Sequence, residues 1–154
     1  MPTKKIIMTI AIVHQEDKVL LGLKKRGFGM NRWNGFGGKV EKDETIEESA
    51  VRETFEEASI ELLDLRKLGE IDFSFEHKDE ILEVHIFKST KYGGTPEETE
   101  EMKPAWFDVS EIPFKKMWSD DPYWFPLFLE NKTFKGKFHF DKKDKIISHE
   151  IIET

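Results

Sequence analysis

One segment of the chain, residues 44–58, repeats its apolar residues with helical spacing, and runs with the composition of strands stand on both sides of it. The strand-like runs are residues 6–13, 19–23, 67–75, 81–89, 106–109, 134–140 and 145–152. A second helix is expected from the Asp121-Pro122 pair through Trp124 and Phe128 toward Asn131. This order predicts an α+β fold in which a mixed β-sheet is sandwiched between α-helices.

The length of 154 residues suffices for one domain with a hydrophobic core, and we expect a single domain over residues 1–154. The chain has no cysteines, which excludes disulfides and thiolate metal sites. Apolar runs such as residues 6–13 are far shorter than the roughly 20 residues that a membrane span requires. The chain also does not start with a basic-then-apolar signal segment, so we expect a cytoplasmic location and no membrane partner.

The formal net charge of −7 argues against a polymeric nucleic acid as partner, because its phosphates need a basic surface. A small phosphorylated ligand is not excluded by this charge. An acidic protein that handles a polyphosphate needs divalent cations between the two sets of negative charges. We therefore expect a cluster of carboxylates that can bind such cations.

Residues 26–38 hold five glycines among Phe28, Trp33 and Phe36. This density of glycine breaks regular structure and allows the backbone to approach another group closely. We expect a functional loop here, between the first strand pair and the first helix.

On a helical wheel, residues 44–58 place Val51, Thr54, Phe55 and Ala58 on one face, which we expect to point inward. Thr45 and Glu48 form a candidate capping box. The carboxylates of Glu53, Glu56 and Glu57 gather on the roughly opposite face, where they repel one another unless a cation lies between them. A solvated acidic face is the simpler interpretation, and a divalent metal site is the functional one.

The spacing around these glutamates decides between the two interpretations. Gly38 is followed after five residues by Glu44, after seven more by Arg52-Glu53, and after two more by Glu56-Glu57. This pattern resembles the signature of the Nudix hydrolase family, the Nudix box, here over residues 38–60. Thr54 departs from the usual aliphatic residue of the box, and Ser59 from its usual glycine.

The resemblance implies Mg²⁺ as cofactor, replaceable by Mn²⁺. It assigns as metal ligands Glu53, Glu56, Glu57, the carbonyl of Gly37, and an acidic residue from a later loop, where this chain has Glu101. Arg52 is expected to hold a glutamate through a bidentate pair, and Glu44 belongs with it to the catalytic set. Glu53 and Glu56 are both candidates for the group that takes a proton from the attacking water.

Further blocks, among them residues 24–29, 32–40, 94–96, 112–115 and 118–126, resemble the MutT-homologue group of the family in animals. That group hydrolyses oxidised purine nucleoside triphosphates, such as 8-oxo-dGTP and 2-hydroxy-dATP, to the monophosphate and pyrophosphate. This implies a monomeric enzyme with a small-molecule substrate. It also assigns to substrate binding Thr9, Lys24, Phe28, Asn34, Phe36, Gly37, Gly38, Lys39, Phe73, Phe75, Leu82, Trp118, Ser119, Asp120, Asp121 and Trp124.

Asp120 and Asp121 allow two interpretations. Asp121 before Pro122 suits a helix N-cap with a favourable dipole interaction. Alternatively the two carboxyl groups face the edge of a base, where they cannot both ionise easily and therefore share a proton. Such a pair would donate from one oxygen and accept with another, and so recognise more than one purine edge.

Two other functions remain open from the sequence. The chain could be a Nudix hydrolase of ordinary nucleotides or dinucleoside polyphosphates, since Leu82 and Ser119 differ from the methionine and proline of the animal enzymes. It could also be a binding module that has lost catalysis, but such modules lack box carboxylates, and here Glu44, Glu53, Glu56 and Glu57 are all present.

Overall fold

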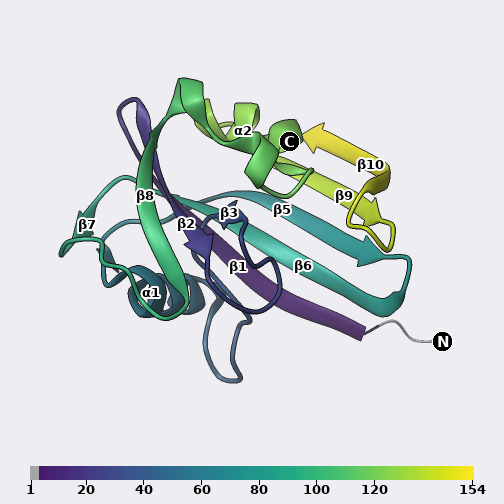
Figure 1. Ribbon diagram of the computed structural model, residues 1–154, viewed down its shortest axis with the longest axis horizontal. Helices are drawn as coiled ribbons and strands as arrows, with labels where there is room; N and C mark the ends of the chain where they lie inside the picture. Colours follow the sequence, from purple (N-terminus) through teal and green to yellow (C-terminus); the bar gives the residue numbers. More distant parts are fainter. Residues whose placement is uncertain (1–3) are drawn as a thin grey trace.

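The computed structural model describes residues 4–154, which form ten strands, two α-helices and two short 3₁₀ turns (Figure 1). The helices are α1 (Ile46–Ala58) and α2 (Asp121–Leu129), and the 3₁₀ turns are η1 (Val109–Glu111) and η2 (Phe114–Lys116). The strands are β1 (Lys4–Gln15), β2 (Lys18–Lys24), β3 (Trp33–Asn34), β4 (Glu61–Leu62), β5 (Arg66–Phe75), β6 (Lys78–Ser89), β7 (Tyr92–Gly93), β8 (Met102–Asp108), β9 (Phe134–Phe140) and β10 (Ile146–Glu153).

The main sheet has the strand order β10-β9-β5-β6-β1-β2-β3, with β8 also paired to β2. β1 runs parallel to β6, and β5 runs parallel to β9, whereas the other pairs are antiparallel. The sheet is therefore mixed, as the sequence predicts. A separate two-stranded sheet joins β4 to β7.

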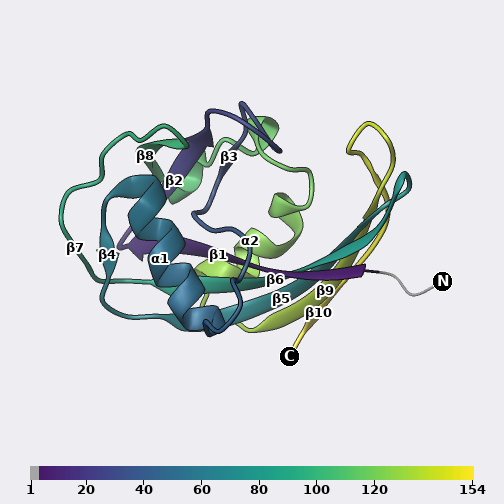
Figure 2. The same ribbon diagram turned by 90° about the horizontal axis from the view of Figure 1, so that it is seen from below.

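The two faces of the sheet carry two hydrophobic cores. Alternation along β1 sends Ile12 into one core, with α2 and the phenylalanines of β5 and β9, and sends Ala11 and Val13 into the other, with α1. Figure 1 shows α1 and α2 on opposite sides of the sheet, and the turned view of Figure 2 shows α1 crossing β1. The expected sandwich of a mixed sheet between helices is confirmed.

Helix α1 begins as predicted but is rotated from its expected orientation. Thr45 and Glu48 form the capping box, and the hydroxyl of Thr54 donates to the Ala50 carbonyl at 2.8 Å. Phe55, which we expected to face inward, is 59% exposed, so that expectation is wrong. The inward face instead carries small residues and Glu57, whose carboxylate accepts a hydrogen bond from the Gly37 N–H of the glycine loop, residues 26–38.

Helix α2 starts at Asp121 with Pro122 in its first turn, as expected. The N-cap is Asp120 and not Asp121, and its side chain makes no capping hydrogen bond. Capping therefore does not explain why two aspartates stand here. Neither helix in residues 4–154 is long and apolar enough to span a bilayer.

Candidate active site

The glycine loop lies against the backbone of β1. Phe36 exchanges backbone hydrogen bonds with Ala11 at 2.7 and 2.9 Å, and Thr9 N–H donates to the Gly38 carbonyl at 2.9 Å. A Cβ at position 37 would lie 1.7 Å from the Thr9 carbonyl oxygen, and a Cβ at 38 would lie 2.8 Å from the Glu53 carboxylate. Only glycine fits at position 37, whereas a Cβ at position 38 would require the Glu53 side chain to move. This close approach places the loop directly beside the glutamates of α1.

Glu57 is the most deeply buried carboxylate of α1, with 4% of its surface exposed. Its Oε1 accepts a hydrogen bond from the Gly37 N–H at 2.9 Å. Burial raises the pKa of Glu57 to about 8, and burial also raises the pKa of Glu53. Both groups are thus poorly solvated as anions and would gain from a positive charge placed between them.

Arg52 links the remaining acidic groups. Its guanidinium donates to both oxygens of Glu44 at 2.7 and 3.0 Å, which is the bidentate pair expected from the sequence. The same group reaches Glu53 at 2.9 Å and Glu56 at 3.3 Å. Because Arg52 stabilises the ionised form, the pKa of Glu44 falls to about 2.

Glu101 approaches this cluster from the segment before β8. Its negative charge is the smallest of the causes that raise the pKa of Glu57, after burial and the charge of Glu53. Two cations hold Glu101, since Lys24 Nζ lies 3.5 Å from its Oε2 and Arg26 also pairs with it. Glu101 is thus linked to the pocket through Lys24, which lines it, and the assignment of Glu101 as a metal ligand stays a prediction.

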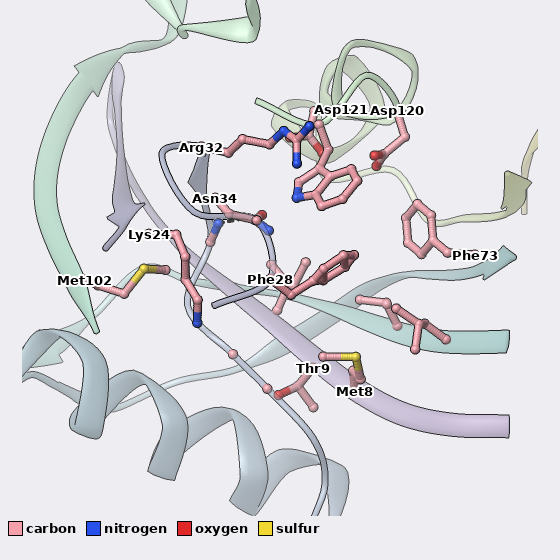
Figure 3. Close-up of a pocket in the computed structure, with 18 of the residues that line it drawn as sticks. Met8, Thr9, Lys24, Phe28, Arg32, Asn34, Phe73, Met102, Asp120 and Asp121 are labelled. Atoms are coloured by element: carbon pink, nitrogen blue, oxygen red, sulfur yellow. Dashed lines mark hydrogen bonds between the residues drawn. The ribbon is translucent and has the colours of Figure 1, made fainter. Parts of the chain in front are cut away.

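A pocket extends from these glutamates to the N-terminal end of α2 (Figure 3). Glu57, Gly37 and Gly38 line one end, and Asp120 and Asp121 line the other. The predicted binding residues that line it are Thr9, Lys24, Phe28, Asn34, Gly37, Gly38, Phe73, Phe75, Leu82, Trp118, Asp120 and Asp121. Residues from both halves of the chain thus meet in a single continuous pocket.

Asp120 and Asp121 are each 3% exposed at the end of this pocket. Asp120 Oδ2 accepts from the indole N–H of Trp124 at 2.9 Å, while Oδ2 of Asp121 has no hydrogen-bond partner. Burial raises the pKa of both carboxyl groups, and the charge of Asp120 raises that of Asp121 further. The pair is consistent with one ionised and one protonated carboxyl group, as the base-edge interpretation requires.

Four predicted binding residues lie outside the pocket lining. Phe36 is fully buried in the core beside α1, and Trp124 is buried in the core around α2, where it reaches the pocket only through Asp120. Lys39 and Ser119 are exposed. Each is the chain neighbour of a residue that does line the pocket, Gly38 or Asp120.

Thr9 lines the pocket, but its hydroxyl lies 3.5 Å from the hydroxyl of Ser49 in α1. The flanking Met8 and Ile10 also line the pocket, together with Arg32, Val84, Met102 and Phe140, which we did not assign from the sequence. Period-two geometry could not have identified Met8 and Ile10, because alternation from the assigned Thr9 leads to Ile7 and Ala11.

A NUDIX domain model matches residues 4–128 of the chain. The chain belongs to the Nudix family. Two curated relatives named oxidized purine nucleoside triphosphate hydrolase are similar to this Nudix chain over 148 residues. The protein from Danio rerio is 49% identical and the one from Mus musculus is 50% identical, each match covering 96% of this chain and 95% of the relative.

The fold comparison agrees. The crystal structure of a MutT protein from Bacillus halodurans superposes with a TM-score of 0.85 and 26% sequence identity, covering 95% of this chain and 97% of that one. The α+β architecture of this Nudix chain is therefore shared with solved MutT structures.

Nudix hydrolases generally use a divalent metal ion, and the acidic side of α1 fits one. Glu53 and Glu57 are carboxylates in poorly solvated surroundings, and the Gly37–Gly38 backbone passes beside them with no side chain in between. Oxygen ligands of this kind suit a hard cation. The site suits a divalent ion because its ligand atoms are oxygens and because Glu53 and Glu57 are shielded from water.

A second group of side chains that could bind a metal ion lies elsewhere on the sheet. Atoms of Glu70, Glu83 and His85 lie within 4.8 Å of one another. Both carboxylates already pair with lysines: Lys5 Nζ lies 3.2 Å from Glu83 Oε1, and Lys67 Nζ lies 3.0 Å from Glu70 Oε1. The spacing of the histidines does not reveal this group, since Glu70 comes from the neighbouring strand of the sheet.

Proposed function

We propose that this Nudix protein hydrolyses oxidised purine nucleoside triphosphates, such as 8-oxo-dGTP and 2-hydroxy-dATP, to the monophosphate and pyrophosphate, with Mg²⁺ as cofactor. The observation that carries the proposal is the pocket, which has Glu57 at one end and the Asp120–Asp121 pair at the other. A nucleotide bound along it would have its phosphates at the glutamates and its base at the aspartates.

At the phosphate end, Mg²⁺, or Mn²⁺ in its place, would be held by Glu53, Glu56, Glu57, Glu101 and the Gly37 carbonyl. When bound there, such ions neutralise the phosphates and activate water for in-line attack on phosphorus. Lys24, which lines the pocket, provides a positive charge for a phosphate oxygen. Arg52 orients Glu53 and Glu56, the two candidates for accepting the proton of the attacking water.

At the base end, the buried aspartates supply one hydroxyl donor and several acceptors. The side-chain oxygen of Asn34 already accepts from the Gly35 N–H at 2.8 Å, which leaves its amide N–H groups to donate to the base. Phe28, Phe73 and Trp118 provide the flat apolar walls that suit a purine. This combination favours purines that carry an extra oxygen at the ring edge.

The relatives that are about half identical carry the name of this activity, which supports the same substrate class for this chain. The alternative enzymatic function, hydrolysis of ordinary nucleotides or dinucleoside polyphosphates, uses the same box glutamates. It gives no role to two buried aspartates at the end of the pocket. A binding module without catalysis is disfavoured because each box carboxylate is present.

Turnover of purified protein with Mg²⁺ on 8-oxo-dGTP, 2-hydroxy-dATP, dGTP, dATP and a dinucleoside polyphosphate tests the proposal. We expect the two oxidised substrates to have the highest kcat/KM and to release pyrophosphate. Equal or higher kcat/KM for the ordinary nucleotides would overturn the substrate assignment, and release of orthophosphate would overturn the reaction assignment.

We also propose that residues 1–154 form one domain that acts as a monomer, since every group assigned to the site comes from a single chain. A free nucleotide, and not a polymeric nucleic acid, is the expected partner because the chain is strongly acidic. The cytoplasm, where free nucleotides are abundant, is the expected location. Size-exclusion chromatography with light scattering and cell fractionation test these statements.

A further inference from the structure

The two aromatic rings that meet beside the aspartate end of the pocket each lie under a cation. The rings of Phe28 and Trp118 contact each other with their centroids 5.0 Å apart. The Arg32 guanidinium carbon lies 4.1 Å from the centre of the Trp118 ring, and Lys78 Nζ lies 4.8 Å from the centre of the Phe28 ring. Both distances are within the range of cation–π contacts.

Contacts far apart in the sequence hold Arg32 in this position. Its Nη2 pairs with Oδ2 of Asp144 at 3.3 Å, across 112 residues of sequence, and Asp144 lies in the turn between β9 and β10. Gly29 brings the loop against the indole, because a Cβ there would lie 3.3 Å from Trp118 Nε1. Figure 3 shows Arg32 at the same end of the pocket as Asp120 and Asp121, away from Met8 and Thr9.

A cation on one face of an aromatic ring partly neutralises the negative electrostatic potential of that ring. The ring then attracts a second positively charged partner less well, whereas a neutral purine can still stack on it. An N7-alkylated purine carries a positive charge in its base, and an oxidised purine is neutral. The aspartate pair acts in the opposite direction, because it carries one negative charge when its two carboxyl groups share a proton, but this charge is the same with or without a cation on the aromatic rings.

We propose that Arg32, and to a smaller extent Lys78, make the base subsite selective for neutral purines over cationic, N7-alkylated purines. This inference rests on the proposed function, since it assumes that the base binds beside Trp118 and Phe28. Arg32 has the larger effect because it is two-thirds buried and lines the pocket, whereas Lys78 is exposed to water, which screens its charge.

The test measures binding of two monophosphates by calorimetry, at a mildly acidic pH where the N7-methylated base is cationic. One is N7-methyl-GMP, and the other is O6-methyl-GMP, which has the same added methyl group without the charge. We expect the wild type to prefer the neutral nucleotide. Arg32→Gln should reduce that preference about threefold to tenfold, and Lys78→Gln about twofold.

Two further variants separate charge from structure. Lys18→Gln removes one positive charge at an exposed position without an aromatic contact, so the preference should stay unchanged. Arg32→Lys keeps the charge and should keep most of the preference. An equal effect of Arg32→Gln on both nucleotides, or a preference as large as in the wild type, would overturn the inference. Hydrolysis of 8-oxo-dGTP by the wild type, measured in parallel, shows separately whether the proposed function holds.

Discussion

Trp124 of α2 donates its indole N–H to Oδ2 of Asp120 at 2.9 Å, and both side chains are buried. The bond fixes one oxygen of Asp120 as an acceptor. The neighbouring Asp121 keeps an oxygen without a hydrogen-bond partner at the end of the pocket. A buried polar atom of this kind is costly unless a ligand satisfies it.

Replacing either aspartate should therefore change substrate recognition more than folding. We expect Asp120→Asn and Asp121→Asn each to lower kcat/KM on 8-oxo-dGTP or 2-hydroxy-dATP about tenfold to a hundredfold, because a misplaced donor leaves a buried group unpaired. The losses on the two substrates should be unequal. Asp17→Asn, at an exposed aspartate, is the control, and unchanged activity of both pocket variants would contradict the role of the pair.

The raised pKa of Asp121 also predicts a pH dependence of stability. The folded protein keeps a proton that the unfolded chain releases above the ordinary aspartate pKa of 3.8, so the free energy of unfolding falls as pH rises from there. An asparagine at this position cannot titrate. The Asp121→Asn variant should be about as stable as the wild type near pH 4 and more stable by about 1 kcal/mol or more at neutral pH.

Thermal denaturation of both proteins across this pH range measures the difference directly. Titrating groups away from the pair, such as Glu57, contribute to both proteins and cancel in the comparison, whereas Asp120 belongs to the pair and its change is part of the measured effect. A difference in Tm that does not grow with pH would show that Asp121 is already ionised in the folded state.

Substituting Ser59 by glycine should stabilise the protein. Ser59 is the C-cap of α1 and adopts φ 61° in the left-handed region, which is unfavourable for a residue with a Cβ. Ser59→Gly should raise the free energy of unfolding by about 0.5 to 1 kcal/mol, since relief of strain exceeds the added entropy of glycine. Ser59→Ala keeps the strain and should give no gain. Chemical denaturation compares the three proteins, and equal values for the glycine and alanine variants would contradict this explanation.

The sequence predicted the parts of the site that are local in the chain. The box spacing predicted that Arg52 would contact neighbouring glutamates, because side chains on successive turns of one helix recur at fixed intervals, and Arg52 does contact Glu44, Glu53 and Glu56. The departure at Thr54 is also explained locally, by its bond to Ala50. Alternation placed Phe73 and Phe75 on one face of β5.

The parts that the sequence could not predict depend on tertiary packing. The helical wheel put Phe55 inside, but the glycine loop that packs on α1 selects small residues and covers Glu57 instead. The pairing of Arg32 with Asp144 joins two loops, and no periodic pattern connects them. The wrong assignment of the α2 N-cap has the same origin, because burial in the pocket takes the aspartates away from a capping role.

The glutamates of the box give a direct catalytic prediction. Glu53→Gln and Glu56→Gln should each lower kcat by about a hundredfold or more, because the amide can neither bind a cation as well nor take a proton. Glu47→Gln is the matched control, since Glu47 is an exposed glutamate of the same helix. Circular dichroism should show the same fold in all three variants. Near wild-type kcat in both box variants would contradict their catalytic assignment.

In the proposed function, Glu53, Glu56 and Glu57 of α1 hold a divalent ion that they share with the nucleotide. Calorimetric titration of Mg²⁺, and of Mn²⁺ in a parallel run, into protein saturated with a non-hydrolysable 8-oxo-dGTP analogue tests it most directly. We predict saturable uptake by the wild type and by Glu47→Gln, and strongly weakened uptake by Glu53→Gln. Absence of uptake by the wild type, or uptake by Glu53→Gln as tight as that of the wild type, would contradict the claim.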